Sequence, residues 1–244
     1  MTAADRLALR RSRVLSATRW RDNAEMIAAA FAMHVTPRHR SSVPTVLDPT
    51  YGKGGWWNAR YWPAGLPTVV AHDKDLDGTD FRKLDHPDAS FAAIAYDPPY
   101  VCVGGRTTTT LPEFQDAYGM DDAPTTPNAL QDLIDDGLTE MWRLACPGAT
   151  VLVKCQDYVS SGRLWLGEDR TTAHALGLGF RVADKWRYIS GGGRPQPSSR
   201  TRRRRPSDGP DAPERVPTVQ QHAHRNESLL LVLRKPGALP RAMR

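Results

Sequence analysis

Residues 91–100 read Phe-Ala-Ala-Ile-Ala-Tyr-Asp-Pro-Pro-Tyr. The first six are apolar or aromatic, and a short apolar run that stops at prolines predicts a buried β-strand. The strand is expected to end at Asp97, because the residue before a proline favours extended geometry and proline cannot donate to a sheet ladder. Taken alone, the tetrapeptide Asp97–Tyr100 is best explained as an ordinary strand-to-turn stop, since Asp and Pro both favour turns.

The side chains of this tetrapeptide also suit one kind of ligand, a flat base that carries an amino group. The lone pair of such an amine is delocalised into the ring, so the nitrogen has to be re-aimed before it can attack an electrophile. An ionised Asp97 accepts one amine hydrogen, and a carbonyl that precedes a proline is free to accept the other. Tyr100 would stack on the ring. Asp97, Pro98, Pro99 and Tyr100 are therefore the candidate catalytic residues, acting by position rather than by proton transfer.

A second informative stretch, residues 45–55, reads Thr-Val-Leu-Asp-Pro-Thr-Tyr-Gly-Lys-Gly-Gly. An apolar strand breaks here into a glycine-rich turn, and glycines allow the backbone to approach a ligand closely. A phosphate loop of Walker type is disfavoured, because Gly52-Lys53 is not followed by Ser or Thr and the upstream glycine spacing is missing. A ligand-binding loop and a plain glycine turn are equally compatible with these residues taken alone.

Acidic residues follow the next predicted strand, which covers residues 68–73. Asp73 ends it roughly 20 residues beyond the glycine turn, where nucleoside-binding α/β folds place the carboxylate that holds a ribose. Asp75 is the rival position for this role. Asp80, with Phe81 beside it, lies in the turn before the strand that leads to the tetrapeptide, where a side chain can reach an adenine amino group.

The order of glycine turn, strand-end acid, Asp80 and Asp97-Pro98-Pro99-Tyr100 resembles the S-adenosylmethionine-dependent amino-methyltransferases of nucleic acids, in particular short DNA methyltransferases of actinobacterial and phage type. The resemblance covers roughly residues 20–235, and the DPPY motif is its most specific part. It implies an α/β, Rossmann-like fold of the class I methyltransferase type, with a doubly wound, mostly parallel seven-stranded sheet and helices on both faces. It also implies S-adenosyl-L-methionine as the cofactor.

The resemblance assigns roles to matching positions only. The cofactor-binding residues that it implies are Asp48, Pro49, Thr50, Gly52, Gly54, Asp73, Asp80 and Phe81. The glycine turn would line the methionine part of the cofactor, Asp73 its ribose, and Asp80 with Phe81 its adenine. A tyrosine and a lysine in the turn depart from the commonest pattern of the family. Lys154 and Asp157 would support the site from the neighbouring strand end, although a solvated strand terminus explains them equally well.

The rest of the chain follows the same order of elements. Helices are expected over residues 17–35, 130–144 and 173–180, and strands over residues 149–155, 181–188 and 228–233. The chain is expected to form one methyltransferase domain over residues 1–244. Its predicted irregular parts are a flexible N-terminus (1–16), a substrate-loop insertion (101–128) that closes over the base, a basic flexible insertion before the last strand (190–222) and a tail (236–244).

Positive charge is concentrated toward the C-terminus. Residues 181–244 hold 15 Lys and Arg against 5 Asp and Glu, whereas residues 1–180 hold 18 against 22. Arginines in a segment rich in Gly, Pro and Ser suit phosphate contacts that do not depend on base sequence. The candidate nucleic-acid-binding residues are Arg194, Arg200, Arg202, Arg203, Arg204 and Arg205. A merely solvated insertion is the alternative.

Composition narrows the class of protein further. With 244 residues, 40% hydrophobic and 25% charged, the chain suits a globular enzyme domain. Neither a membrane-spanning apolar run nor an apolar signal core is present, so a cytoplasmic location is expected, or the host cytoplasm for a phage protein. Cys102, Cys146 and Cys155 lack CxxC spacing, and His222 and His224 have no further clustered ligands, so neither a disulfide framework nor a metal site is expected.

The expected function is methyl transfer to an exocyclic amino group of a base in DNA, with adenine N6 as the preferred target and a restriction–modification context. The same motif is compatible with cytosine N4 in DNA, and with guanine N2 or adenine N6 in RNA. A third hypothesis is a nucleic-acid-binding protein that retains the fold without turnover. The expected partner is thus nucleic acid, DNA before RNA, and no membrane.

Overall fold

A computed structural model of the chain describes residues 20–35, 45–63, 65–99, 124–160, 163–189 and 227–237. Several predicted features lie outside these ranges. They are the N-terminus 1–16, the insertion 190–222, Tyr100, Cys102, His222, His224 and the six candidate arginines. Most of the substrate-loop insertion lies outside as well, and its last residues begin a helix at Pro127.

The described residues form one six-stranded sheet in the order β2-β1-β3-β4-β8-β7. Its strands are β1 (Thr45–Asp48), β2 (Thr68–Ala71), β3 (Phe91–Tyr96), β4 (Ala145–Cys155), β7 (Arg181–Ile189) and β8 (Glu227–Arg234). β8 runs antiparallel to both of its neighbours, and the other pairs are parallel. The mostly parallel sheet that the sequence predicted is therefore confirmed.

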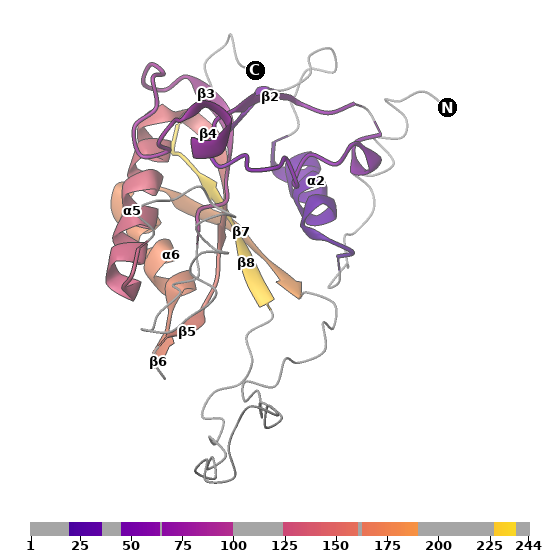
Figure 1. Cartoon of the computed structure of the whole chain (residues 1–244). Coiled ribbons are helices and arrows are strands. Elements are labelled where there is room, and N and C mark those ends of the chain that lie inside the picture. The colour runs from indigo at the N-terminus through magenta and orange to yellow at the C-terminus, as the bar shows by residue number, and fades with distance from the viewer. Residues whose placement is uncertain are drawn as a thin grey trace, which may run out of the picture.

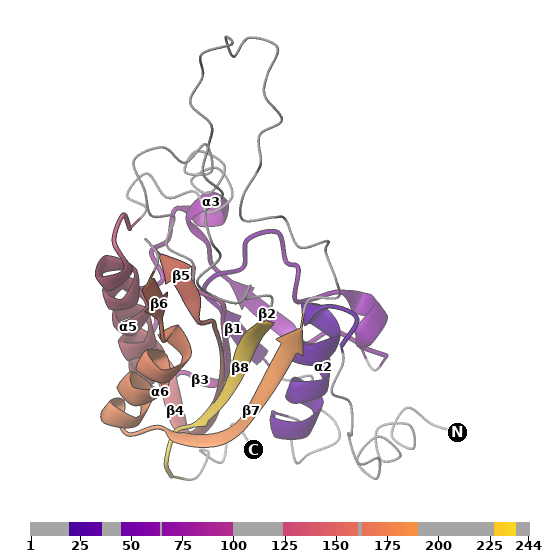
Figure 2. The same ribbon diagram turned by 90° about the horizontal axis from the view of Figure 1, so that it is seen from below.

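Helices cover both faces of this sheet (Figures 1 and 2). The helix α2 (Asn23–His34) lies on one face, and α5 (Pro127–Leu144) and α6 (Gly167–Leu178) lie on the other. Two shorter helices, η1 (Ala59–Tyr61) and α3 (Lys74–Asp77), belong to the connections that follow β1 and β2. The arrangement confirms a doubly wound, Rossmann-like α/β fold.

The predicted number of seven strands is corrected to six within the described residues. Between β2 and β3, residues 72–90 form α3 and turns but no strand, because this segment is rich in Asp and has no run of apolar residues to bury. Two further strands, β5 (Tyr158–Ser160) and β6 (Arg163–Trp165), form a separate antiparallel hairpin that the sequence did not predict.

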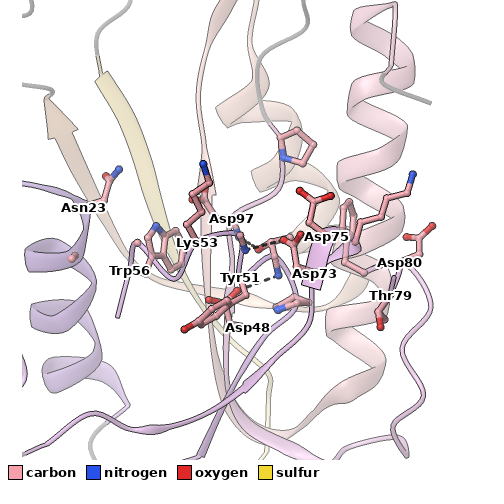
Figure 3. A pocket seen from close by; sticks show the side chains of 18 of the residues that line it. Asn23, Asp48, Tyr51, Lys53, Trp56, Asp73, Asp75, Thr79, Asp80 and Asp97 are labelled. Atoms are coloured by element: carbon pink, nitrogen blue, oxygen red, sulfur yellow. Dashed lines mark hydrogen bonds between the residues drawn. The ribbon is translucent and has the colours of Figure 1, made fainter. Parts of the chain in front are cut away.

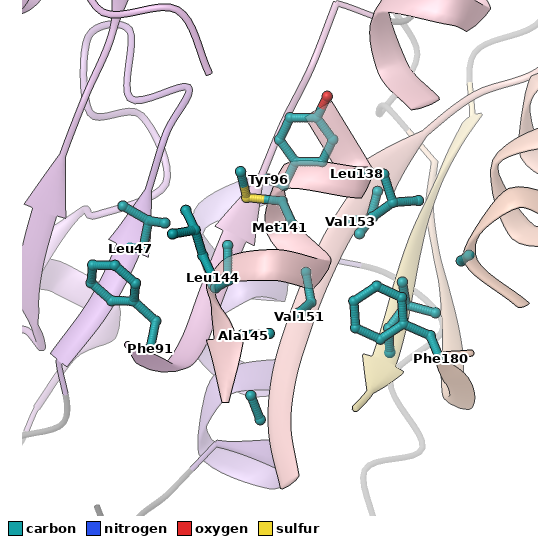
Figure 4. Close-up of a cluster of buried hydrophobic side chains, with 14 of the residues drawn as sticks. Leu47, Phe91, Tyr96, Leu138, Met141, Leu144, Ala145, Val151, Val153 and Phe180 are labelled. Carbon is teal, nitrogen blue, oxygen red and sulfur yellow. The ribbon is translucent and has the colours of Figure 1, made fainter. Parts of the chain in front are cut away.

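The core is divided between the two faces by the alternation of side chains along each strand. Ile94 and Tyr96 of β3 point to the α5 and α6 side, whereas Ala93 and Ala95 point to the α2 side. The cluster of buried side chains on the α5 and α6 side is drawn in Figure 4. Since a strand covered on both faces is apolar at every position, this packing explains the unbroken apolar run before Asp97. None of the described helices combines the length and the apolar character that crossing a bilayer requires.

Candidate active site

A cavity of about 930 Å³ lies at the carboxyl edge of β1, β2 and β3 (Figure 3). Its walls come from the glycine turn after β1, from α3 and the turn that follows it, from the end of β3, and from parts of α2, α5 and β7. β2 lies on one side of β1 and β3 on the other. The cavity is thus placed where the strand order reverses, which is where open α/β sheets bind ligands.

Most of the predicted site residues that the structure describes line this one cavity. They are Asp48, Pro49, Thr50, Gly52, Asp73, Asp80, Phe81, Asp97 and Pro99. Gly54 and Pro98 were predicted with them and lie beside them in the chain, but they do not line the cavity. The tertiary fold therefore brings the glycine turn and the tetrapeptide to a shared space.

Asp48 ends β1 and is 3% exposed. Its Oδ1 accepts a hydrogen bond from the Thr50 backbone N–H (3.1 Å), and its Oδ2 accepts one from the indole N–H of Trp57 (2.6 Å). Burial raises the pKa of Asp48 to about 7, the two hydrogen bonds oppose the rise, and the negative charges of Asp97 and Asp73 add to it. Asp48 thus anchors the glycine turn as well as facing the cavity.

Asp73 holds the other side of the glycine turn. Its Oδ2 accepts from the Gly52 N–H (2.8 Å), and its Oδ1 accepts from the Asp75 N–H (3.0 Å), which caps α3. Gly52 and Gly54 have φ values of +53° and +68°, in the left-handed region that favours glycine. Each carboxylate oxygen of Asp73 keeps a further lone pair for a ligand. Asp75 lines the cavity too, so both predicted positions for a ribose acid reach it.

Asp80 and Phe81 form the wall beyond α3. Arg82 donates to Asp80 from Nε (3.0 Å) and from Nη2 (2.5 Å), and these bonds lower the pKa of the half-exposed Asp80 carboxyl. Arg82 itself lines the cavity, although sequence analysis did not select it. The Phe81 ring packs edge-on against Tyr96, with 5.6 Å between ring centroids.

Asp97 carries a buried hydrogen-bond acceptor that is not used within the described protein. Its Oδ1 has less than 1 Å² of exposed surface and no hydrogen-bond partner. Its backbone N–H donates to the Thr50 hydroxyl oxygen (2.8 Å), which ties the glycine turn to the tetrapeptide. Burial raises the pKa of Asp97 to about 6, against the opposing effects of the Lys154 ammonium and a hydrogen bond from Trp56. Leaving such an atom unsatisfied is costly, so it marks a place for a donor from a ligand.

The structure adds residues that sequence analysis did not assign to the site. Asp22 caps α2 and accepts from the Tyr61 hydroxyl (2.8 Å), and it lines the cavity together with Asn23, whose Oδ1 is also buried without a partner. Trp56 and Tyr188 line further parts of the wall. An Asp before an apolar-periodic segment is a helix-start signal. This signal predicts where α2 begins, but it does not predict that the start of α2 lies beside the cavity.

The charge of the cavity is predominantly negative. Its acidic residues are Asp22, Asp48, Asp73, Asp75, Asp80 and Asp97, and its basic residues are Lys53, Lys74 and Arg82. A cleft lined mainly by one sign of charge attracts a ligand of the opposite sign. In the described ranges, no three His, Cys, Asp or Glu side chains gather in a way that could hold a metal ion.

Comparison with known proteins finds likeness of fold. No protein-family model matches the chain, and no curated protein matches it. Among solved structures it is similar to a candidate DNA modification methylase from Thermus thermophilus complexed with S-adenosyl-L-methionine, at 19% identity and a TM-score of 0.39, over 66% of this chain and 55% of that chain. The match thus spans about half the length of the Thermus protein.

This chain also matches two further solved structures over most of their length. One is the [4+2]-cyclase SpnF, at 14% identity and a TM-score of 0.49, over 93% of this chain and 86% of that chain. The other is a 1,6-didemethyltoxoflavin-N1-methyltransferase from Burkholderia thailandensis with bound S-adenosylhomocysteine, at 15% identity and a TM-score of 0.46, over 89% and 80%. These proteins are named for different reactions, so the reaction of this chain has to be argued from its own residues.

Proposed function

We propose that this protein transfers a methyl group from S-adenosyl-L-methionine to the exocyclic amino group of a base in DNA, with adenine N6 as the preferred target. The observation that carries the proposal is the buried, unpartnered Oδ1 of Asp97 in the same cavity as the glycine turn and Asp73. One region of the cavity is suited to a nucleoside cofactor, and the region beside it offers an acceptor for an amine.

The cavity fits the cofactor in size, in charge and in the side chains available to contact it. A volume of about 930 Å³ is within the range of sites for ligands of this size. Asp73 would accept from the ribose hydroxyls, and Phe81 with Asp80 would contact the adenine. The excess of carboxylates favours a ligand with a positively charged sulfur. When bound, S-adenosylmethionine supplies an electrophilic methyl group.

The residues after β3 would prepare the acceptor nitrogen. Asp97 Oδ1 would accept one amine hydrogen. A backbone carbonyl of the tetrapeptide that precedes a proline would accept the other. Held in this way out of the ring plane, the nitrogen would direct its lone pair toward the methyl group that a bound cofactor supplies. As the N–C bond formed, the S–C bond would break with its electron pair going to sulfur, and the nitrogen would give up one proton to water. Tyr100 would stack on the base. The hydrogen bond between the Asp97 backbone and Thr50 fixes this acceptor relative to the cofactor region.

The proposed substrate is nucleic acid because of the charge of the chain and the shape of the site. The C-terminal excess of arginine suits phosphate contacts. A target base inside a duplex has to leave the stack to enter a cavity at a sheet edge, at a cost of a few kcal/mol. This requirement favours an aromatic contact for the extruded base, such as Tyr100.

Two measurements test the proposal. Calorimetric titration with S-adenosylmethionine should show saturable binding; its absence would reject the cofactor assignment. Incubation with tritium-labelled cofactor and either duplex DNA or total RNA should label the DNA, and nucleoside analysis should identify N6-methyladenine. Label in RNA alone would reject DNA as substrate, N4-methylcytosine would correct the base, and binding without transfer to either nucleic acid would favour a non-catalytic protein.

A further inference from the structure

Lys154 is a buried lysine that lies next to Asp97 in the sheet. It is 2% exposed and precedes the last residue of β4. β3 and β4 are parallel, with Ala95 opposite Leu152 and Tyr96 opposite Val153. Continued by one residue, this register puts Asp97 beside Lys154. Ala95 and Leu152 point to the α2 side of the sheet. Because side chains two residues apart in a strand lie on the same face, Asp97 and Lys154 point to that side as well.

The groups around this pair come from the neighbouring strands and the glycine turn. From β1, the Asp48 carboxyl lies close enough for the Asp97 charge to raise its pKa. From β4, the Cys155 thiol acts on Lys154. From β7, the Tyr188 ring lies with its centroid 5.8 Å from the Lys154 ammonium. From the glycine turn, Trp56 hydrogen-bonds the Asp97 side chain. None of these four neighbours carries a positive charge, so the lysine supplies the cation of this group.

Asp97 and Tyr188 line the cavity, whereas Lys154 does not. A ligand in the cavity would therefore contact Asp97 and Tyr188 but not Lys154. Burial of a charged side chain is strongly unfavourable unless an opposite charge or other polar partners compensate. A lysine kept at this position thus has to be explained by what it does for its neighbours.

We propose that Lys154 is a positioning residue that holds Asp97 as a carboxylate, ready to accept hydrogen bonds from the substrate amine. In its catalytic consequence this inference rests on the proposed function. A protonated Asp97 would present a donor to the amine, whereas the ionised form presents acceptors only. A buried Asp is pushed toward the protonated form, and a neighbouring ammonium reverses that tendency.

The direction of the pKa changes agrees with this role. Burial raises the pKa of Asp97 to about 6, and the Lys154 charge is the largest effect that opposes the rise. Conversely, burial lowers the pKa of Lys154, and Asp97 is the largest effect that opposes the decrease. Each group therefore favours the charged form of the other.

The test measures Asp97 itself and does not need catalysis. Carboxyl-labelled aspartate in the whole chain is titrated by ¹³C NMR, and the resonance that disappears in Asp97→Asn identifies the group. Lys154→Met and Lys154→Gln should raise the pKa of Asp97 by roughly 1–3 units, the usual effect of a close opposite charge, whereas Lys154→Arg should hold it near the wild-type value. An unchanged pKa in both neutral variants would overturn the proposal.

Lys235→Met is the matched control. This lysine is partly buried and, like Lys154, lies over an aromatic ring, with 4.4 Å between its ammonium and the Trp142 centroid. It follows β8 next to the amino end of β4, whereas Lys154 is near the carboxyl end. Its loss should lower stability without moving the pKa of Asp97. An equal pKa shift in this control would show a general structural effect and also overturn the proposal.

Methyl transfer gives a second readout. In Lys154→Met the transfer rate at pH 6.5 should fall roughly three-fold for a shift of one unit and roughly two-hundred-fold for a shift of three, and it should recover once the pH exceeds the raised pKa of Asp97, because the acid limb of the profile moves with that pKa. A loss that no pH restores would contradict the positioning role. If the pKa shifts as expected but the wild-type protein transfers no methyl group, the proposed function fails and the charge coupling stands.

Discussion

At the scale of single residues, the site depends on how Asp48 and Asp97 are buried. Asp48 ends β1 and Asp97 follows β3, so strand packing removes the Asp48 carboxyl and the Oδ1 atom of Asp97 from water. Asp48 uses its oxygens to hold the glycine turn, whereas Asp97 leaves Oδ1 unused. The same residue type therefore serves as an anchor at one strand end and as an available acceptor at the next.

Asp97→Ala should remove most of the transfer activity while leaving cofactor binding nearly unchanged. Removal of one preorganised hydrogen-bonding group at a reacting centre typically lowers the rate by about 10²–10³-fold. The labelled-methyl assay and calorimetric titration with S-adenosylmethionine measure the two effects. Asp85→Ala, on the exposed turn before β3 and away from the cavity, is the control and should retain both activities. Full transfer by Asp97→Ala would remove Asp97 from the proposed role.

Cofactor binding should release protons near neutral pH. The pKa values of Asp48 and Asp97 are raised to about 7 and about 6, so between pH 4 and 7 the folded protein holds more protons than the unfolded chain. These two groups therefore make the free energy of unfolding decrease as pH rises through that range. A sulfonium ligand favours the ionised carboxyls and lowers both pKa values, so its affinity should increase with pH.

The proton release can be measured by titration calorimetry at pH 6.5 in buffers of different ionisation enthalpy. The observed heat should vary with the buffer in the sense of proton release, and the variation should shrink in Asp48→Asn. Proton uptake on binding, or heats independent of the buffer, would show that the cofactor does not approach these carboxyls.

At the scale of elements, α5 fixes the wall of the cavity through a glycine. A Cβ atom at Gly137 would lie 2.7 Å from ring carbons of Phe81 and still closer to the Tyr96 hydroxyl. Tyr96 in turn donates to the Ile134 carbonyl (3.2 Å). The close approach of α5 to β3 therefore depends on the absence of a side chain at this position.

Gly137→Ala should reduce the free energy of unfolding by roughly 1–3 kcal/mol, because a buried methyl group without space forces its neighbours to move. Denaturant unfolding measures this change. Gly177→Ala in α6 is the matched control, since nothing lies within 4 Å of its Cβ position. It should raise stability by about 0.5–1 kcal/mol through helix propensity. Equal effects of the two substitutions would contradict the packing described for α5.

At the scale of the whole molecule, charge is divided along the chain. The residues that line the acidic cavity all come before position 189. The excess of arginine comes later in the sequence. This division separates the part that would bind a cationic cofactor from the part that would bind a polyanion.

Replacement of Arg202–Arg205 by glutamine should weaken DNA binding and reduce its salt dependence. The slope of log K against log salt is negative, and its magnitude decreases by about 0.9 for every phosphate that the protein no longer neutralises, so it should become shallower by up to roughly 3–4. Glutamine at Arg6, Arg10, Arg11 and Arg13 removes the same charge elsewhere and is the control. Fluorescence anisotropy at several salt concentrations measures both. Equal decreases in the two variants would show that only net charge matters.

Much of the fold was predictable because the core strands are covered on both sides. The run 91–96 is apolar at every position and matches β3 residue for residue, and the predicted final strand lies within β8. The predicted helix 173–180 was displaced from α6, which begins at Gly167, because the first turns of α6 are polar. The hairpin β5–β6 was missed, since three-residue strands carry too little periodicity to be recognised.

The sequence by itself determined the order of elements, the glycine turn and the acids that end the strands, since these follow from local backbone preferences and from which side chains avoid water. Only the tertiary structure decided that Thr50 bonds to the Asp97 backbone, that α2 brings Asp22 to the same cavity, and that Lys154 lies beside Asp97. These contacts join residues that are far apart in the chain, and their distances are fixed by strand register and helix packing, which no local pattern encodes.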